Sequence, residues 1–246
     1  FHDFEEYSVL KTPVIEFHCS ETDLSVDFQG GTKDSSLIVH APEIVDRKLV
    51  DLCSDDQDIV NLSVEILQKS IDKTLDIARR FPKEKPKIVM HLGGMSLDHV
   101  VGEKPNDLMI ERSIDNFKRL NFNPSDIDVL PENLPPRPWY LGGQWFQYGF
   151  MPADDMIRFC EHFNLGMTFD MCHAGLYCNH SGVDLADYAN KIKHLVSHMH
   201  ISDAKGIDGE GVQVGDGNIQ FEKVLNELKD QTHSWVTEIW SGHLHH

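Results

Sequence analysis

Ile127-Asp-Val-Leu-Pro-Glu132 is a short, mostly apolar run that ends on a carboxylate, and three later runs of the chain repeat this pattern. They are Gly166-Met-Thr-Phe-Asp170, Leu195-Val-Ser-His-Met-His200 and Trp235-Val-Thr-Glu238. Each run has the composition of a buried strand of a parallel sheet that becomes polar at its carboxyl end. One such ending is common, because strands must emerge into solvent. Four in succession, ending on Glu, Asp, His and Glu, predict a shared site at the strand ends.

Carboxylate oxygens and imidazole nitrogens are ligands that divalent cations prefer in proteins. If the four strands are neighbours in a barrel, their last side chains converge at its C-terminal face. We therefore expect one divalent metal ion, Zn²⁺, Mn²⁺ or Mg²⁺, and the sequence leaves its identity open. The expected ligands are Glu132, Asp170, His200 and Glu238.

Seven strand-like runs alternate with helical patterns along the chain. The expected strands are Pro13–Cys19, Ser36–Ala41, Pro86–Leu92, Asp126–Glu132, Gly166–Asp170, Leu195–Ser202 and Trp235–Ile239. The expected helices are Phe1–Leu10, Asp58–Phe81, Asp107–Leu120, Asp154–Phe163, Asp184–Leu195 and Phe221–Leu228. The alternation predicts a parallel α/β sheet with right-handed crossovers. Because polar ends occur on nearly every strand, a (β/α)8 TIM barrel fits better than an open sheet, which gathers its site at one switch point.

The length of 246 residues fits a single domain covering residues 1–246. The strand count is one short of a complete barrel, since the chain opens on a helical pattern and stops just after the seventh strand. We expect a first strand before Phe1 and a last helix after His246, which would make this chain part of a longer one. An incomplete barrel is the alternative.

The composition narrows the classes of partner. The formal net charge is −18, which argues against a nucleic-acid surface, because phosphate binding needs clustered Lys and Arg. The five cysteines are odd in number and lack CxxC spacing, which indicates reduced thiols in a cytoplasmic protein. No signal peptide and no apolar stretch long enough for a bilayer is present, so we expect no membrane partner.

Two segments that follow predicted strands are unusual. Pro131–Phe150 is rich in Pro, Gly and aromatic residues, and Asp203–Gly217 is rich in Gly. Long loops at the carboxyl ends of barrel strands often bind substrate. We interpret the first segment as a packed lid, with Trp139, Trp145 and Phe146 either capping a sugar or packing in the core.

The polar residues also carry a resemblance to a known family. Three motifs support it: His40 in His-Ala-Pro, His91 in His-Leu-Gly-Gly, and Asp170-Met-Cys-His173. Together with Glu132, His200 and Glu238, they occur in the order seen in the xylose isomerase-like TIM barrels. This superfamily includes sugar isomerases and epimerases as well as abasic-site nucleases of the endonuclease IV type. The segments HISDAKGIDGEGVQVGDG and TEIWSGH also resemble the barrel module that accompanies some sialic-acid-synthase-like proteins.

The resemblance implies a metal-dependent sugar isomerase or epimerase. In the epimerase branch, residues matching the four expected ligands hold the metal, and those matching Glu132 and Glu238 flank the carbon that loses and regains a proton. The metal acts as a Lewis acid that stabilises the enediolate of a sugar, sugar acid or sugar phosphate. One carboxylate removes the proton and the opposite conjugate acid returns it. Epimerisation and aldose–ketose isomerisation both fit this chemistry.

Further residues are candidates for contact with the sugar. His173 resembles a family histidine that contacts substrate oxygens, and a loop histidine with a structural role is the alternative. The other candidates are His40, His91, Lys205, Asp208, Glu210 and His243. Glu210 stands out among the loop charges, because the Asp-Gly-Glu-Gly sequence places its carboxylate between two glycines, where a ligand can approach closely.

Two alternatives to a sugar enzyme stay open. The first is a non-catalytic or accessory barrel module, fused to or cut from a larger sugar-biosynthesis protein; a homo-oligomer also remains open. The second is an abasic-site endonuclease. That activity uses three zinc ions in the family, the third held by the counterpart of His173 and an Asp-x-His pair. The chain has Asp208-Gly-Glu210 at the corresponding position, so we expect it neither to bind nor to cut DNA.

Overall fold

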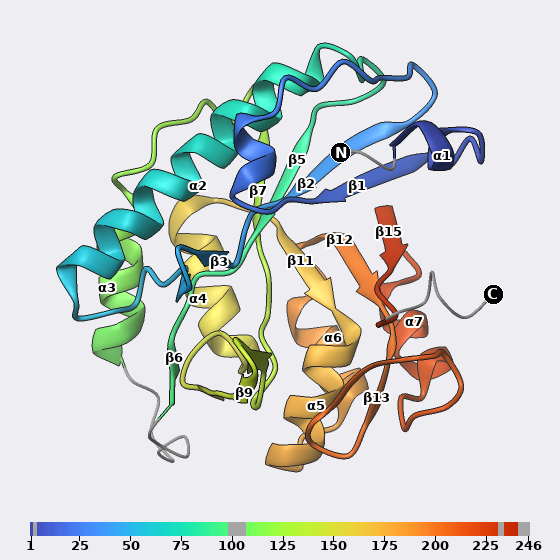
Figure 1. Cartoon of the computed structure of the whole chain (residues 1–246). Coiled ribbons are helices and arrows are strands. Elements are labelled where there is room, and N and C mark those ends of the chain that lie inside the picture. Colours follow the sequence, from blue (N-terminus) through green and yellow to red (C-terminus); the bar gives the residue numbers. More distant parts are fainter. Residues whose placement is uncertain (2–3, 98–106, 231–233, 241–246) are drawn as a thin grey trace. The chain divides into compact units, whose positions relative to one another are not determined.

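A computed structural model describes residues 1, 4–97, 107–230 and 234–240 of the chain (Figure 1). The chain divides into two compact units. The first comprises Phe1–Gly93 and Glu111–Leu130, and the second comprises Gly94–Ile110 and Pro131–His246. The prediction of a single domain over residues 1–246 stays a prediction. No helix within the described ranges combines the length and apolar composition needed to cross a bilayer.

The first unit contains a parallel sheet with the strand order β1-β2-β5-β7. The strands are β1 (Val14–His18), β2 (Ser36–His40), β5 (Lys87–Met90) and β7 (Asp128–Pro131). The other elements are α1 (Phe4–Ser8), the 3-10 turn η1 (Thr22–Ser25), the short β3 (Ile44–Val45) and β4 (Lys48–Leu49), and α2 (Gln57–Ala78). Helix α3 (Asp107–Phe117) begins in residues of the second unit and ends in the first.

The register of this sheet separates an apolar face from a polar one. Phe17 is paired with Val39 and His18 with His40 across β1 and β2. Since successive side chains of a strand point to opposite faces, the aromatic and the imidazole of β1 lie on different sides of the sheet. The strand ends of β1 and β2 therefore place a histidine pair on one face.

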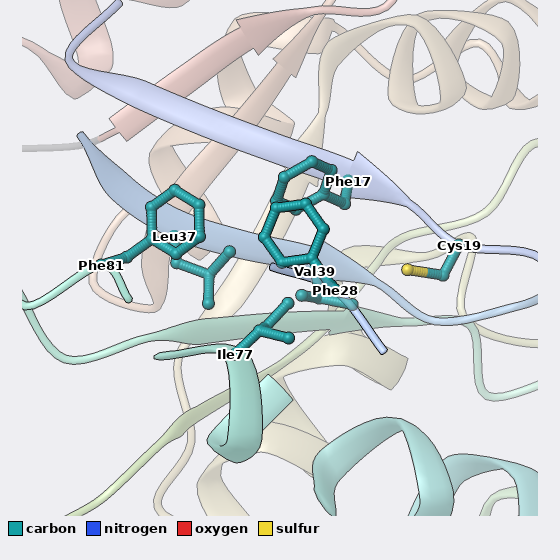
Figure 2. Close-up of a cluster of buried hydrophobic side chains, with 7 residues drawn as sticks. All are labelled: Phe17, Cys19, Phe28, Leu37, Val39, Ile77 and Phe81. Carbon is teal, nitrogen blue, oxygen red and sulfur yellow. The ribbon is translucent and has the colours of Figure 1, made fainter. Parts of the chain in front are cut away.

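The apolar face of this sheet packs against α2 and against loop residues of the first unit. Figure 2 shows the buried cluster of Phe17, Cys19, Phe28, Leu37, Val39, Ile77 and Phe81. The ring centroids of Phe17 and Phe28 are 5.3 Å apart at an interplanar angle of 67°, an edge-to-face arrangement that adds to the burial of apolar area. This core fixes the orientation of β1 and β2, so the polar face carries its histidines on a rigid support.

The second unit contains the parallel sheet β11-β12-β15, built from Met167–Asp170, Val196–Ile201 and Ser234–Thr237. Its helices are α4 (Ala153–Phe163), α5 (Met171–Ser181), α6 (Leu185–Ile192) and α7 (Phe221–Leu228). Its short strands are β6 (Met95–Ser96), β8 (Trp139–Tyr140), β9 (Gly143–Gln144), β10 (Phe146–Gln147), β13 (Asp203–Lys205) and β14 (Gly209–Val212).

All seven expected strands are present, each within three residues of its predicted bounds. The alternation of parallel strands and helices is thus confirmed. Helix α5, however, is absent from the expected helices. Its residues are buried nearly all round and include Gly175, so they show no amphipathic period. The predicted loop Asp203–Gly217 likewise contains an antiparallel hairpin of β13 and β14.

Candidate metal centre

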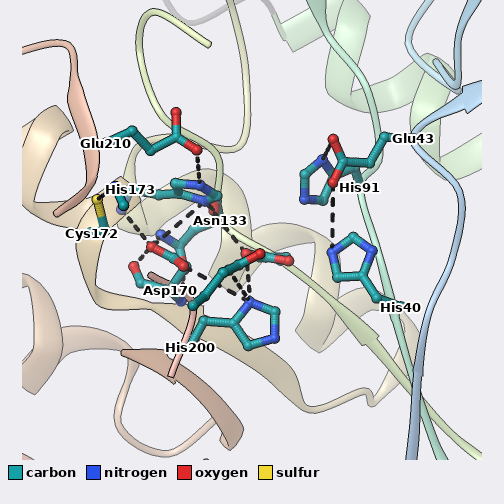
Figure 3. Close-up of polar contacts among 12 residues, drawn as sticks. His40, Glu43, His91, Asn133, Asp170, Cys172, His173, His200 and Glu210 are labelled. Carbon is teal, nitrogen blue, oxygen red and sulfur yellow. Dashed lines mark hydrogen bonds and ion pairs between the residues drawn. The ribbon is translucent and has the colours of Figure 1, made fainter. Parts of the chain in front are cut away.

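The second unit brings three carboxylates and one imidazole together, and we call Glu132, Asp170, His200 and Glu238 the carboxylate tetrad. Figure 3 labels Asp170 and His200 of this group. His200 Nδ1 lies 2.9 Å from Glu238 Oε2 and 3.2 Å from Glu132 Oε1. Asp170 Oδ2 is 3.9 Å from the same nitrogen. One ligand atom from each of the four residues lies within 4.8 Å of those of the others. The four side chains predicted to be ligands therefore converge.

Strand register explains the convergence. Asp170 pairs with His200 across β11 and β12, and His200 pairs with Val236 of β15. Glu238 lies two residues beyond Val236, on the same face, and its backbone N–H donates to the carbonyl of Ile201 at 3.1 Å. Glu132 follows β7 and forms a parallel bridge with Thr168.

Burial makes this concentration of negative charge costly. Glu132 is fully buried, Asp170 and His200 are 1% exposed, and only the Glu238 side chain, at 33%, has substantial access to solvent. Burial raises the pKa of Asp170 to about 8; His173 opposes this, and the charges of Glu132 and Glu238 add to it. Two buried carboxylates beside a third are stabilised by a compensating cation, and oxygen with imidazole ligands suits a divalent metal ion. The donor set thus fits such an ion.

Asn133 orders the tetrad, and sequence reasoning missed it. Its side-chain amide donates to the Asp170 carbonyl at 2.9 Å and accepts from the Asp170 backbone N–H at 3.0 Å. Asp170 in turn caps α5, because its carboxylate accepts the backbone N–H of His173. The available signal was a polar residue directly after a predicted ligand, but an Asn next to Glu132 in a Pro-rich segment is typical of a turn.

His173 links the tetrad to the hairpin of β13 and β14. Its Nδ1 donates to the Asn133 carbonyl at 2.9 Å and lies 3.4 Å from Glu132 Oε1. Its Nε2 lies 3.2 Å from Glu210 Oε1. Burial lowers the pKa of His173, but Asp170 and Glu210 together raise it well above its usual range. His173 lies in the first turn of α5 and not in a loop, and its contact with substrate oxygens stays a prediction.

The hairpin that carries Glu210 is held by a buried carboxylate and a thiol. Asp203 accepts four backbone N–H groups, from Ala204, Gly215, Gly217 and Ile219. Cys172 Sγ donates to the Asp203 carbonyl and accepts from Gly211 N–H, each at 3.3 Å. Gly211 has φ of +65°, and a Cβ there would overlap the Trp240 ring. These contacts fix the position of the Glu210 side chain beside His173.

The first unit holds a second group of polar side chains, which we call the histidine cluster: His18, His40, His91 and Glu43. Figure 3 labels the last three of these residues. Glu43 Oε1 is 3.2 Å from His18 Nε2 and 3.9 Å from His40 Nε2, and its Oε2 is 3.8 Å from His91 Nδ1. Burial would raise the pKa of Glu43, but His91, His18 and His40 lower it well below its usual range. Sequence reasoning missed His18 and Glu43.

The remaining candidates for substrate contact lie outside the carboxylate tetrad and the histidine cluster. Lys205 and Asp208 are exposed on the hairpin, and Trp139 is 58% exposed. Trp145, which directly follows β9, donates its ring N–H to the carbonyl of Tyr140 in β8 at 3.1 Å. His243 lies outside the described residues. The roles of His40, His91, His173, Lys205 and Glu210 in substrate binding stay predictions.

Comparison with known proteins identifies the family. The sequence model of the family described as xylose isomerase-like TIM barrel matches residues 21–243 of the chain. The chain belongs to this family. A curated relative, the uncharacterized protein MJ1311 of Methanocaldococcus jannaschii, is 32% identical over 88 residues, which are 35% of this chain. The match spans 28% of that relative's length.

Three solved structures share the fold. A D-tagatose 3-epimerase-like protein superposes with a TM-score of 0.67 at 19% sequence identity. The match covers 96% of this chain and 84% of the chain of that protein. An L-ribulose 3-epimerase gives 0.65 at 16% identity, covering 97% and 76%. Endonuclease IV from Thermus thermophilus gives 0.58 at 16% identity, covering 96% and 86%. At these identities, the likeness shows the α/β TIM barrel fold and leaves the reaction to be argued from the site.

Proposed function

We propose that the chain is a divalent-metal-dependent isomerase or epimerase of a sugar. The observation that carries the proposal is the tetrad, in which both glutamates approach one imidazole nitrogen, at 3.2 and 2.9 Å. Ketoses are the substrates to test first, because the D-tagatose 3-epimerase-like protein and the L-ribulose 3-epimerase share the fold over nearly the whole chain.

In this proposal the tetrad has two roles, which are to bind a cation and to transfer a proton. Glu132, Asp170, His200 and Glu238 would hold the cation, which supplies Lewis-acid polarisation of a carbonyl and a neighbouring hydroxyl. Glu238, the more exposed carboxylate, accepts a proton from the carbon next to the carbonyl. Glu132, fully buried, is the second acid–base group. Return of the proton from the opposite face inverts that carbon, and its return to the adjacent carbon interconverts aldose and ketose.

His173 and Glu210 orient the substrate in this proposal. His173 Nε2 faces Glu210 Oε1 at 3.2 Å, and the Glu210 side chain is 17% exposed, so a ligand hydroxyl can reach both groups. A carboxylate at this position accepts hydrogen bonds from neutral hydroxyls and repels a phosphate. We therefore propose a neutral sugar, in preference to a sugar phosphate or a sugar acid.

The test is solvent-deuterium exchange. The metal-stripped chain is reloaded with Mn²⁺ and incubated in D₂O with D-fructose, D-psicose, D-tagatose, L-ribulose and D-fructose 6-phosphate. Loss of the proton signal at a carbon next to the carbonyl is followed by NMR. We expect metal-dependent exchange with a neutral ketose and much slower exchange with the phosphate.

A parallel incubation separates the nuclease alternative. A duplex with one abasic site is offered at low salt, where electrostatic binding to DNA is strongest. Metal-dependent incision with no exchange in any sugar would overturn the proposal. Exchange that persists at full rate after chelation would also contradict it, since the tetrad would then not work through a cation.

A further inference from the structure

Strand register builds the histidine cluster of the first unit. His18 is the last residue of β1 and is paired with His40, the last residue of β2. His40 is in turn paired with Val89 of β5. His91 lies two residues beyond Val89 and therefore points to the same face. Three imidazoles thus gather at the carboxyl ends of three adjacent parallel strands.

The loop after β2 adds a carboxylate to these rings. Glu43 lies three residues beyond His40, and its side chain is 17% exposed. The rings of His18 and His40 are 4.1 Å apart between centroids, and those of His40 and His91 are 5.1 Å apart. Ligand atoms of His18, His40 and Glu43 all lie within 4.8 Å of one another.

The hydrogen bond of His40 orients the ring as metal-binding histidines are oriented. Its Nδ1 lies 2.9 Å from the carbonyl oxygen of Ala41, which can only accept, so Nδ1 carries the proton. Nε2 then faces the Glu43 carboxylate at 3.9 Å. Metal-binding histidines usually donate their second ring N–H to a backbone carbonyl or a carboxylate, which fixes the tautomer and aims the other nitrogen at the ion.

We propose that His18, His40 and Glu43 form a second cation site, with His91 beside it, and that it prefers Zn²⁺. Bond lengths of about 2.0–2.2 Å to Zn²⁺ place neighbouring tetrahedral ligands roughly 3.4 Å apart. The N–O separations of 3.2 and 3.9 Å in the cluster bracket this value. Imidazole-rich sites favour Zn²⁺ over Mn²⁺ and Mg²⁺. The His18 side chain is 53% exposed, so ions can enter without unfolding the sheet.

The experiment measures Zn²⁺ binding to the chelator-stripped chain by isothermal titration and by elemental analysis after gel filtration. We expect two equivalents in the unmodified chain and one in Asp170→Asn, which disables the tetrad. In His18→Ala and Glu43→Gln, we expect the second equivalent to bind at least about 100-fold more weakly, the upper end of losses caused by more distant metal-site residues.

The matched control is His194→Ala. His194 Nε2 lies 3.3 Å from Glu161 Oε1 in an exposed pair, so this variant removes a histidine–glutamate contact without a cluster around it. It should bind both equivalents as the unmodified chain does. If His18→Ala and Glu43→Gln bind as many equivalents as the unmodified chain, with unchanged affinity, the second site does not exist.

Side-chain NMR makes the result independent of how the variants fold. In the unmodified chain with ¹⁵N-labelled histidines, the ring signals of His18 and His40 should move as Zn²⁺ is added, while those of His194 stay. Unmoved signals of His18 and His40 would overturn the proposal. Because Zn²⁺ alone is the probe, a failed sugar test leaves this result unaffected.

Discussion

The two polar groups of the molecule are chemical opposites built by the same means. The carboxylate tetrad has three carboxylates and one imidazole, and the histidine cluster has three imidazoles and one carboxylate. Both stand at the carboxyl ends of adjacent parallel strands whose register aligns them. The same arrangement of strand ends therefore produces two kinds of ligand set. One is rich in oxygen and suits Mn²⁺ or Mg²⁺, and the other is rich in nitrogen and suits Zn²⁺. The difference lies in the residues at and just beyond the strand ends.

The largest expected effect is on proton transfer. Glu238→Gln keeps the size of the side chain and an oxygen for the cation, but it cannot act as a base. We expect deuterium exchange into the ketose to fall by about 10³-fold, within the range for loss of a general base. Glu161→Gln, the same change at an exposed glutamate, should leave exchange intact. Undiminished exchange in Glu238→Gln would remove this residue from the catalytic role.

The next effect concerns which group binds which metal. Asp170→Asn should weaken Mn²⁺ binding about 100-fold, because it removes one of the anionic ligands of a buried set. Glu43→Gln should leave Mn²⁺ affinity close to that of the unmodified chain. Electron paramagnetic resonance of free Mn²⁺ measures both. Equal losses in the two variants would show that the two groups do not differ in their metal preference.

A third prediction concerns the stability of the hairpin of β13 and β14, which lies beside the tetrad. Asp203→Asn loses the charge that holds four backbone N–H groups, and we expect the free energy of unfolding to fall by about 2 kcal/mol. Burial raises the pKa of Asp203, but these bonds lower it below its usual value. A lowered pKa in the folded state contributes stability above the unfolded pKa of about 3.9.

That stability is lost as the pH falls through the pKa of folded Asp203, so the difference in unfolding free energy between Asp203→Asn and the unmodified chain should narrow as the pH falls below about 3.9. Urea unfolding at pH 7 and at pH 3 measures it. Zn²⁺ binding at the histidine cluster should not change in this variant. A gap that stays constant with pH would mean that the charge of Asp203 does not hold the loop.

The smallest effect tests how tightly the hairpin is packed. Gly211→Ala places a Cβ against the Trp240 ring at a φ of +65°, whereas Gly206→Ala at +67° meets nothing within 4 Å. Both variants carry the backbone cost of a positive φ, roughly 1 kcal/mol. We expect Gly211→Ala to be destabilised by about 1 kcal/mol more, because the ring must move. Equal melting temperatures would show that Trp240 does not support the hairpin.

Local patterns predicted the strands, most helices and the convergence of the tetrad, because apolar runs with polar ends are a short-range signal. The contacts that complete the site were not predictable in this way. Asn133 acts through its amide on a main chain 37 residues away, and His18 meets Glu43 from 25 residues away. Helix α5 was missed because a helix buried nearly all round has no polar stripe to mark its period.

Asp170 limits how this protein can diverge. Its carboxylate belongs to the tetrad and also caps α5, and its main chain is held on both sides by the Asn133 amide. Asn, Ser and Thr can also cap a helix, but none of them brings a negative charge to a cation. A lineage that acquires a new substrate or metal is therefore expected to vary the hairpin around Glu210 first, while position 170 stays fixed by two unrelated selective pressures.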